Sequence, residues 1–304
     1  MYPDCRDGPE RPEFAALMAK VESLGVSCEL GLLQRHCTAE PLGLFRFGYT
    51  PLDGLIRALE DDLKEVGARE KLRATTAENL EYFVSHEDYG FEFHTYQFAD
   101  RISEDELLRK VAAHFGFLAR KLTEELRNGD KLFVYRPESH VPAPQDALRL
   151  TETLSRFGSP VLLWVELTND PARFGTSEWA VPGRMITGYL DWFAGVRYAA
   201  AMSFENWVLM LQSAVALWEG LLTECDIKLA AARRARAEGA YDVAFEICSE
   251  LLARFRDRSE PIVEAANLLC LLGQEEDART LLAIGLSRFP SDPDLANGFV
   301  RLTG

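Results

Sequence analysis

The chain has 304 residues, of which 47% are hydrophobic and 27% charged, and its formal net charge is −15. This balance is typical of a folded protein, and the length is sufficient for two domains. The acidic charge argues against nucleic acid or an anionic membrane as the main partner, because both select surfaces rich in lysine and arginine. No apolar run reaches about 18 residues, so we expect no membrane-spanning helix.

The first residues and the cysteines indicate the compartment. The chain begins MYPDCRDGPERPEF, which lacks the basic start and the apolar stretch of a secretory signal. Its six cysteines show no CxxC spacing. In a chain without an export signal we expect them to be reduced thiols, and we therefore predict a cytoplasmic protein.

Strands and helices are predicted to alternate along the first part of the chain. The segment KVESLGVS predicts a strand and a turn at Gly25, and a helix follows over residues 28–36. A second helix is predicted for PLDGLIRALEDDLKEVG, where apolar residues recur at helical spacing. The segment NLEYFVSHEDYGFEFHTYQF alternates like two strands around a turn at residues 88–90. A long amphipathic helix is then predicted, with Ser103 as its cap.

Two short apolar runs, KLFVYR and SPVLLWVEL, are separated by a helix predicted over residues 145–157. A strand–helix–strand order of this kind favours parallel strands in one sheet. Residues 169–184 are predicted to form a loop. Together these patterns predict a three-layer α/β domain over residues 12–203.

The C-terminal part contains an internal repeat. Five residues recur after 34 positions: Gly239, Ala244, Leu252, Arg254 and Phe255 match Gly273, Ala278, Leu286, Arg288 and Phe289. This period resembles the tetratricopeptide repeat, which places Gly in a turn between two helices and small Ala where they pack. The resemblance implies an all-α pair of helical hairpins over about residues 224–257 and 258–291, within a helical region spanning 204–304. Two repeats bury little surface, so we expect a helix over residues 204–222 to dock them onto the α/β domain.

Cys28 is the most suggestive candidate for chemistry. It follows a predicted strand and turn and opens a predicted helix. The N–H groups and the dipole at a helix N-terminus favour a thiolate, and cysteine hydrolases place their nucleophile at such a position. A free cysteine is also often buried as a small apolar side chain, and its position alone leaves that interpretation open.

The segments SLGVSCELGLLQRH, TPLDGLIRAL and YGFEFHTYQF resemble a family of papain-like cysteine peptidases of unknown function. That family has a Ser-Leu-Gly turn before a Cys, a Pro-Phe-Asp-Trp segment and a strand containing a His. The resemblance covers about residues 21–170. It implies that Cys28 is the nucleophile, that His94 is the general base and that Asp53 is a structural or orienting residue.

The acid partner of His94 stays open. Thr95 follows His94 where the family commonly has an Asp. A catalytic pair requires His94 within hydrogen-bond reach of the Cys28 sulfur, together with a carboxylate or amide that fixes the ring. The candidates for this third group are Asp53, Asp100 and Asp191.

Cofactors and metals are not expected. The cysteines and histidines show no ligand-like spacing for zinc, and the chain has no glycine-rich phosphate loop. We therefore predict neither nucleotide hydrolysis nor hydride chemistry.

Three hypotheses for the function remain. The first is a cysteine-dependent hydrolase or acyl transferase that uses Cys28 and His94, with the repeats recruiting a partner. The second is a non-catalytic interaction or scaffold protein that binds a protein or peptide through its repeats. The third is an accessory to glycan modification, by analogy with repeats of this type fused to glycosyltransferases. None of them involves nucleic acid, and the oligomeric state is not predicted.

Overall fold

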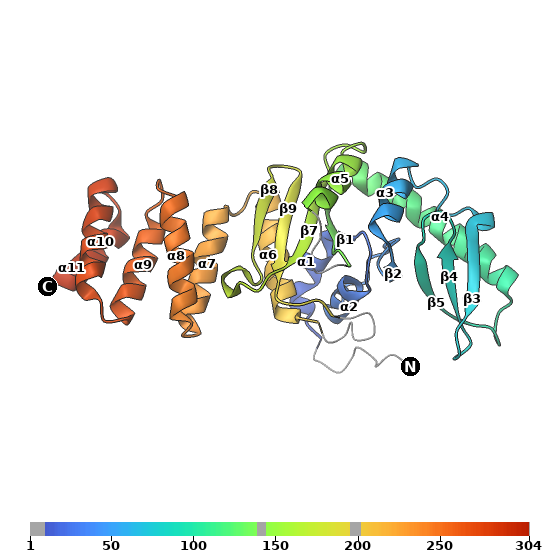
Figure 1. Cartoon of the computed structure of the whole chain (residues 1–304), viewed down its shortest axis with the longest axis horizontal. Coiled ribbons are helices and arrows are strands. Elements are labelled where there is room, and N and C mark those ends of the chain that lie inside the picture. The colour runs from blue at the N-terminus through green and yellow to red at the C-terminus, as the bar shows by residue number, and fades with distance from the viewer. Residues whose placement is uncertain (1–9, 139–143, 195–201, 304) are drawn as a thin grey trace.

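A computed structural model describes residues 10–138, 144–194 and 202–303. The molecule is elongated, with helical hairpins at one end and a small antiparallel sheet at the other (Figure 1). A larger, mostly parallel sheet lies between them. The predicted combination of an α/β part and C-terminal helical hairpins is confirmed.

The central sheet has the strand order β1-β6-β7-β9-β8. The first four strands of this order run parallel, and β8 runs antiparallel to β9 at the edge. All four residues of β6 are buried, as expected for apolar strands covered on both faces. The strands are β1 (Val21–Ser23), β6 (Leu132–Tyr135), β7 (Val161–Leu167), β8 (Ser177–Val181) and β9 (Met185–Leu190).

Helices cover both faces of the central sheet, which gives three layers. One apolar cluster joins the sheet to α1 (Ala15–Ala19), α2 (Glu29–His36) and α6 (Phe204–Trp218). Another joins the opposite face to α3 (Leu52–Glu60) and α5 (Pro144–Leu154). A short 3-10 helix, η1 (Pro12–Phe14), precedes α1.

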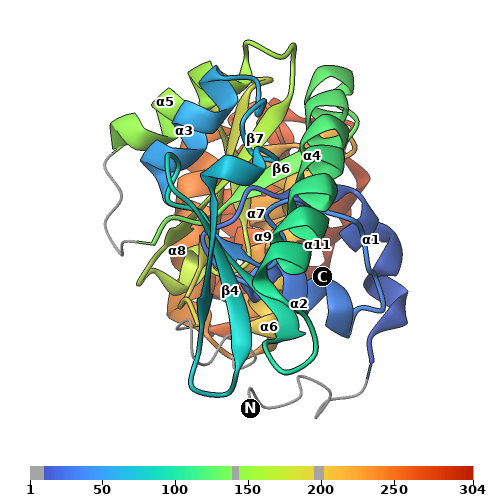
Figure 2. The same ribbon diagram turned by 90° about the vertical axis from the view of Figure 1, so that its right-hand side faces the viewer.

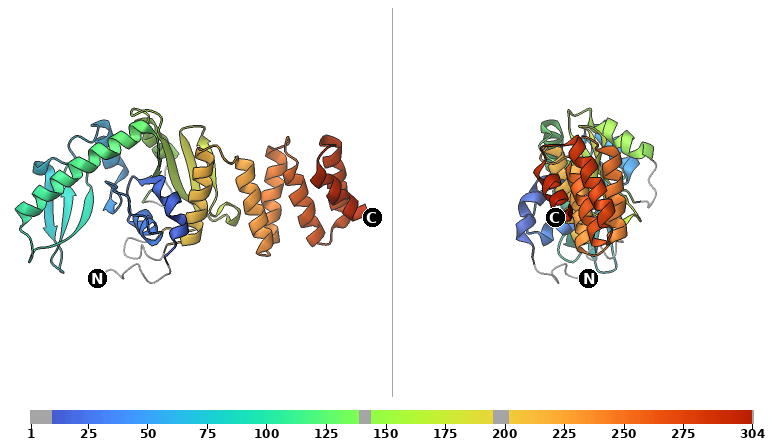
Figure 3. Two further views of the ribbon diagram at one scale, coloured as in Figure 1. Left: turned by 180° about the vertical axis from the view of Figure 1, so that it is seen from behind. Right: turned by 90° about the vertical axis from the view of Figure 1, so that its left-hand side faces the viewer.

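A second sheet, which we call the antiparallel sheet, extends the domain. Its strand order is β2-β5-β4-β3. The strands are β2 (Gly48–Tyr49), β3 (Leu72–Thr76), β4 (Glu81–His86) and β5 (Glu92–Phe98), with η2 (Arg69–Lys71) before β3. The 25-residue helix α4 (Glu104–Asn128) packs along this sheet (Figures 2 and 3). The Ser103 hydroxyl accepts a hydrogen bond from the N–H of Glu106, so the predicted cap is present.

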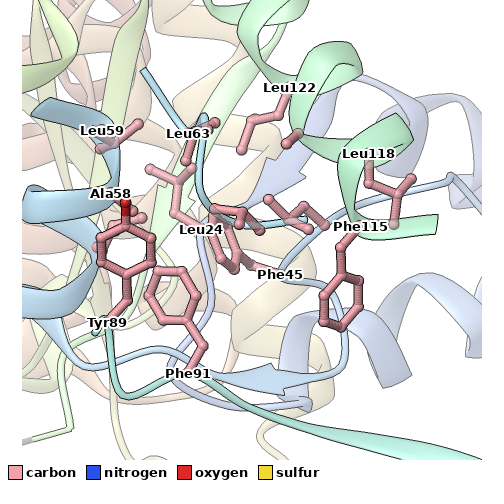
Figure 4. Close-up of a cluster of buried hydrophobic side chains, with 14 of the residues drawn as sticks. Leu24, Phe45, Ala58, Leu59, Leu63, Tyr89, Phe91, Phe115, Leu118 and Leu122 are labelled. Carbon is pink, nitrogen blue, oxygen red and sulfur yellow. The ribbon is translucent and has the colours of Figure 1, made fainter. Parts of the chain in front are cut away.

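The two sheets share one hydrophobic core. Phe45, Phe91 and Phe115 lie in it together with leucines of α3 and α4 (Figure 4). The Phe45 and Phe91 rings meet edge to face, with centroids 5.0 Å apart. This shared core fixes the antiparallel sheet relative to the β1–α2 turn, since Leu24 belongs to the same cluster.

The prediction of a loop over residues 169–184 is wrong. This segment contains η3 (Pro171–Arg173) and strand β8. The residues of β8 do not alternate regularly between buried and exposed, and only Ser177 is fully buried. As an edge strand, β8 pairs with a neighbour on one side alone. The segment is a strand because it pairs with β9, and not because of a local apolar pattern. The pairing includes a register shift between Trp179 and Val181.

The C-terminal helices form the two predicted hairpins, and a final helix follows them. They are α7 (Glu224–Ala237), α8 (Tyr241–Arg254), α9 (Glu260–Leu271), α10 (Glu275–Arg288) and α11 (Pro293–Thr303). Gly239 and Gly273 occupy equivalent inter-helix turns with φ of +80° and +74°. Ala244 and Ala278 are buried at equivalent positions of α8 and α10. The 34-residue offset is therefore confirmed in three dimensions.

Helix α6 packs on β8 and β9 and belongs to the core of the central sheet. The repeats contact the α/β part differently, because α7 packs against β8 and η3, and α8 against η3. The helix expected over residues 204–222 is present, and Ile227 of α7 lies in the same apolar cluster as α6. By packing, α6 belongs with the sheet, although the predicted boundary at 203 places it with the helical region.

Candidate functional site

Polar side chains gather where β1 and β6 end, at the carboxyl edge of the central sheet. In open α/β sheets this edge is where ligands commonly bind. A small cavity of about 10 Å³, room for one water molecule, opens there. It is lined by Ser23, Gly25, Ser27, Leu30, Val134, Arg136 and Trp207.

Glu29 and Arg136 form a buried ion pair beside this cavity. Glu29 is completely buried, and its Oε2 lies 3.0 Å from Nε of Arg136. The indole N–H of Trp207 and the backbone N–H of Ala194 donate to Glu29 Oε1 at 2.9 and 3.3 Å. Burial raises the pKa of Glu29 and lowers the pKa of Arg136, because it disfavours both charges, while each partner opposes the shift of the other. This network ties α2, α6 and the ends of β6 and β9 together.

Cys28 is the N-cap residue of α2, directly before Glu29 in the chain. Its side chain is half-buried. Ser27 next to it accepts a hydrogen bond from the N–H of Glu29 at 3.3 Å. The thiol therefore lies at the positive end of a helix and at the carboxyl edge of the sheet, as the sequence predicts.

Most other described cysteines are shielded. Burial raises the pKa of Cys37 to about 11 and the pKa of Cys248 to about 12. The pKa of Cys225 is also raised by burial. Cys270 is half-buried, and Cys5 lies outside the described residues. These environments disfavour the thiolate and leave Cys28 as the candidate nucleophile in the α/β domain.

His94 lies on β5, opposite Phe83 of β4. Its Nδ1 is 3.3 Å from Oε1 of Glu81, a carboxylate with 5% exposure. The His94 ring packs against Phe83 at 4.3 Å between centroids and stacks with Tyr96 at 5.9 Å. The carboxylate beside the histidine is thus Glu81, which none of the sequence candidates includes.

The turn that carries Cys28 packs tightly on residues 45–50. A Cβ atom on Gly25 would lie 2.2 Å from Oγ1 of Thr50. A Cβ atom on Gly31, in the first turn of α2, would lie 2.5 Å from the carbonyl oxygen of Arg46. Only glycine permits such an approach.

The strand that carries His94 packs on the same segment. Gly48, within residues 45–50, pairs with Phe93, the residue before His94. A Cβ atom on Gly48 would lie 2.7 Å from the Phe93 ring. The Cys28 turn and the His94 strand thus share residues 45–50 as a common neighbour.

The three predicted acid partners lie in different surroundings. Asp53, in the first turn of α3, is exposed and pairs with Arg149 at 3.1 Å. Asp100 is exposed in a turn after β5. Asp191 follows β9, and its Oδ1 is buried without a hydrogen-bond partner among the described residues. A carboxylate within hydrogen-bond range of His94 is provided by β4 instead, because cross-strand pairing brings the two strands together.

Two further histidines of the α/β domain, His36 and His86, have separate surroundings. His36 packs on Phe204, and His86 stacks on Tyr89 and lies 2.9 Å from the carbonyl oxygen of Glu65. Within residues 10–138, 144–194 and 202–303, no group of three or more His, Cys, Asp or Glu side chains is arranged to hold a metal ion. Over the same ranges, none of the helices has the length and apolar character needed to cross a membrane.

The first helices of the two hairpins, α7 and α9, and the final helix α11 present a polar face. Glu264 of α9 is buried and binds Arg236 at 2.6 Å and Arg233 at 3.3 Å, both from α7. Asn267, one turn later on α9, accepts a hydrogen bond from Arg301 of α11 at 3.0 Å. We call the surface formed by Arg233, Arg236, Asn267 and Arg301 the arginine face.

Comparison with known proteins identifies the C-terminal part alone. The tetratricopeptide repeat family matches residues 235–298, which run from the end of α7 into α11. No curated protein and no solved structure gave a significant match. The helical region therefore contains a tetratricopeptide repeat, a module that binds proteins, whereas the papain-like resemblance of the α/β domain gains no support.

Proposed function

We propose that this protein binds an acidic peptide segment of a partner protein along the arginine face of its repeats. The observation that supports this most directly is the set of three guanidinium groups on this face, two from α7 and one from α11, on either side of α9. Arg233 and Arg236 share one buried carboxylate, Glu264, whereas Arg301 donates to the neutral side chain of Asn267. The face therefore has an excess of positive charge, although the whole chain has a net charge of −15. Such local complementarity selects partners and speeds their association.

The test uses the full chain and pools of labelled peptides that are acidic, neutral or basic. We expect the acidic pool to bind best, and binding to weaken with added salt. The double variant Arg233→Ala/Arg301→Ala should bind about three- to tenfold more weakly, because each exposed charge pair contributes modestly. Arg236 is retained, since its removal would leave Glu264 buried without its nearest partner.

Arg279→Ala provides a matched control. Arg279 is exposed on α10, a second helix of a hairpin, and its removal should leave binding unchanged. Equal binding of acidic and basic peptides, or equal loss in the control and in the double variant, would refute this proposal.

A second candidate function is thiol-dependent acyl transfer or hydrolysis in the α/β domain. It is favoured by the position of Cys28 as a half-buried N-cap at the sheet edge. His94 lies on β5, which packs on residues 45–50 as the Cys28 turn does, and its carboxylate partner Glu81 lies on the neighbouring strand β4. In this reaction the Cys28 sulfur attacks a carbonyl carbon and its proton passes to His94. His94 returns that proton to the leaving group. Water then adds its OH to the acyl carbon, the carboxylic acid leaves, and the remaining proton restores the thiol.

Limited alkylation with iodoacetamide, mapped by mass spectrometry, tests this second candidate. We expect Cys28 to react before Cys37. The variant His94→Ala should shift the pH profile of Cys28 alkylation upward, towards the roughly 8.5 of an ordinary thiol. His114→Ala, on the exposed side of α4, should not. Faster labelling of Cys37, or an unchanged profile in His94→Ala, would remove this candidate.

A further inference from the structure

Glu81 is a buried carboxylate directed at the candidate base. It has 5% exposure at the start of β4. Its Oε1 lies 3.3 Å from Nδ1 of His94 and accepts a hydrogen bond from the backbone N–H of Tyr96 at 3.2 Å. A carboxylate is costly to bury unless such donors compensate it. Both donors come from the same short stretch of β5.

An irregularity of the sheet produces this arrangement. The pairing of β4 with β5 shifts between Glu81 and Phe83, so that β5 has extra residues where β4 has one. Within this bulge Tyr96 has φ of +53°, and Leu80, before Glu81, has φ of +65°. Positive φ is uncommon for residues other than glycine. Bulges re-aim side chains, and this one brings the Tyr96 N–H and the His94 ring to the same carboxylate oxygen.

We infer that Glu81 is the positioning residue of His94, an inference that rests on the proposed thiol chemistry of Cys28. An ionised carboxylate can only accept hydrogen bonds, so its contact with His94 requires the proton on Nδ1. Nε2 then has the lone pair, which is the nitrogen that must take the thiol proton. Phe83 packs on the His94 ring at 4.3 Å and resists its rotation.

Asp53, one of the three carboxylates considered from the sequence, is engaged elsewhere. The Asp53 side chain is 71% exposed and is bound by Arg149 across the α3–α5 contact. An exposed carboxylate in water orients a ring weakly, because solvent screens it. The Glu81 side chain is only 6% exposed, so solvent screens its interaction with His94 much less.

The first measurement is the tautomer of His94, read from its ring ¹⁵N chemical shifts in the full chain. We expect the Nδ1–H form in the parent protein and a mixture of both neutral forms in Glu81→Gln. The matched control is Glu87→Gln. Glu87 lies in the turn between β4 and β5 and forms a surface ion pair with Arg73 of β3. An Nε2–H form in the parent, or an unchanged spectrum in Glu81→Gln, would overturn the inference.

The second measurement is the rate of Cys28 alkylation near neutral pH. Glu81→Gln should slow it about tenfold, comparable to the smaller losses found when the hydrogen-bond partner that orients a metal-bound histidine is removed. The effect should be smaller than that of His94→Ala, and thermal melts should show that Glu81→Gln remains folded.

The two measurements separate the inference from its premise. If His94→Ala slows alkylation while Glu81→Gln changes neither rate nor tautomer, Glu81 has no positioning role and the thiol chemistry stands. If neither variant changes the alkylation rate, the Cys28–His94 pair itself fails, and with it the role of Glu81.

Discussion

The α/β domain and the helical repeats are stabilised in different ways. In the α/β domain, strands far apart in the chain pair with one another, as Val21 does with Leu132. In the repeats, each helix packs on its neighbours in sequence. Stability of the repeats therefore depends on local packing, whereas the domain depends on contacts that close long loops.

The two regions also differ in what they bury. The interior of the domain contains several charged side chains with partners from distant segments, namely Glu22, Glu29, Glu81, Arg46 and Arg136. Among the described residues of α7 to α11, Glu264 is the one charged side chain that is buried. A buried charge is tolerated when its partner is present and is strongly destabilising when it is absent. The domain should therefore be the more fragile region towards loss of single polar groups.

The largest effect is expected for Arg136→Met. This change leaves Glu29, which is completely buried, without its charge partner. We expect the free energy of unfolding, measured in urea, to fall by about 3–5 kcal/mol. Arg149→Met removes the exposed pair with Asp53 and should cost less than about 1 kcal/mol. Equal losses in the two variants would contradict the distinction between buried and exposed pairs.

A pH-dependent effect is expected at Glu22. Burial raises the pKa of this carboxyl to about 7, against the opposing charges of Lys121 and Lys131, with Glu125 adding to the rise. Arg46 is a further cation close enough to interact with it. The folded protein keeps the Glu22 proton to higher pH than the unfolded chain does, whose carboxyl titrates near 4.5. Stability is therefore highest below about pH 4.5 for this group, and is lost as the pH rises towards 7.

Glu22→Gln tests this sign. The raised pKa of Glu22 corresponds to a fall of about 3 kcal/mol in the free energy of unfolding between pH 4.5 and pH 7. Urea unfolding at several pH values should show a flatter dependence in the variant than in the parent, with the variant gaining in relative stability above neutral pH. A parallel dependence in both proteins would show that Glu22 does not titrate in this window.

Overpacking tests the repeats. Ala244→Trp and Ala278→Trp insert a large ring where the paired helices approach closely, since both alanines are buried. Each should destabilise by about 1–3 kcal/mol or more, and by similar amounts. Ala253→Trp, at an exposed position of α8, should change the melting temperature little. Unequal losses of stability in Ala244→Trp and Ala278→Trp would mean that the two hairpins do not pack equivalently.

The smallest effects concern glycine. Gly239→Ala and Gly273→Ala add a methyl group into open space but retain a positive φ, so each should cost about 1–2 kcal/mol of backbone strain. Gly116→Ala, inside α4 of the α/β domain, meets nothing closer than the end of Arg120 at 3.7 Å. It should stabilise by about 0.5–1 kcal/mol. Urea unfolding should show a loss of stability in the first two variants and a gain in the third. A stability change of the same sign in all three would contradict the explanation by backbone conformation.

The amino-acid sequence alone determined the features that depend on neighbours in the chain. The 34-residue repeat, its two turn glycines, the start of α2 at Cys28 and the cap of α4 at Ser103 could all be predicted, because turns, caps and amphipathic helices follow from local chemistry. The parallel strands β6 and β7 were predictable for the same reason, as short apolar runs around a helix.

The tertiary structure decided what depends on distant partners. Strand β8 and the two-residue strand β2 lack a strong pattern and exist because β9 and β5 pair with them. The position of α6 on the central sheet is set by the apolar surface of that sheet, with which α6 shares a core cluster. Glu81 comes to His94 through a bulge that no spacing in the sequence signals. Side chains from separate strands meet only when the register is set, and register is a property of the folded sheet.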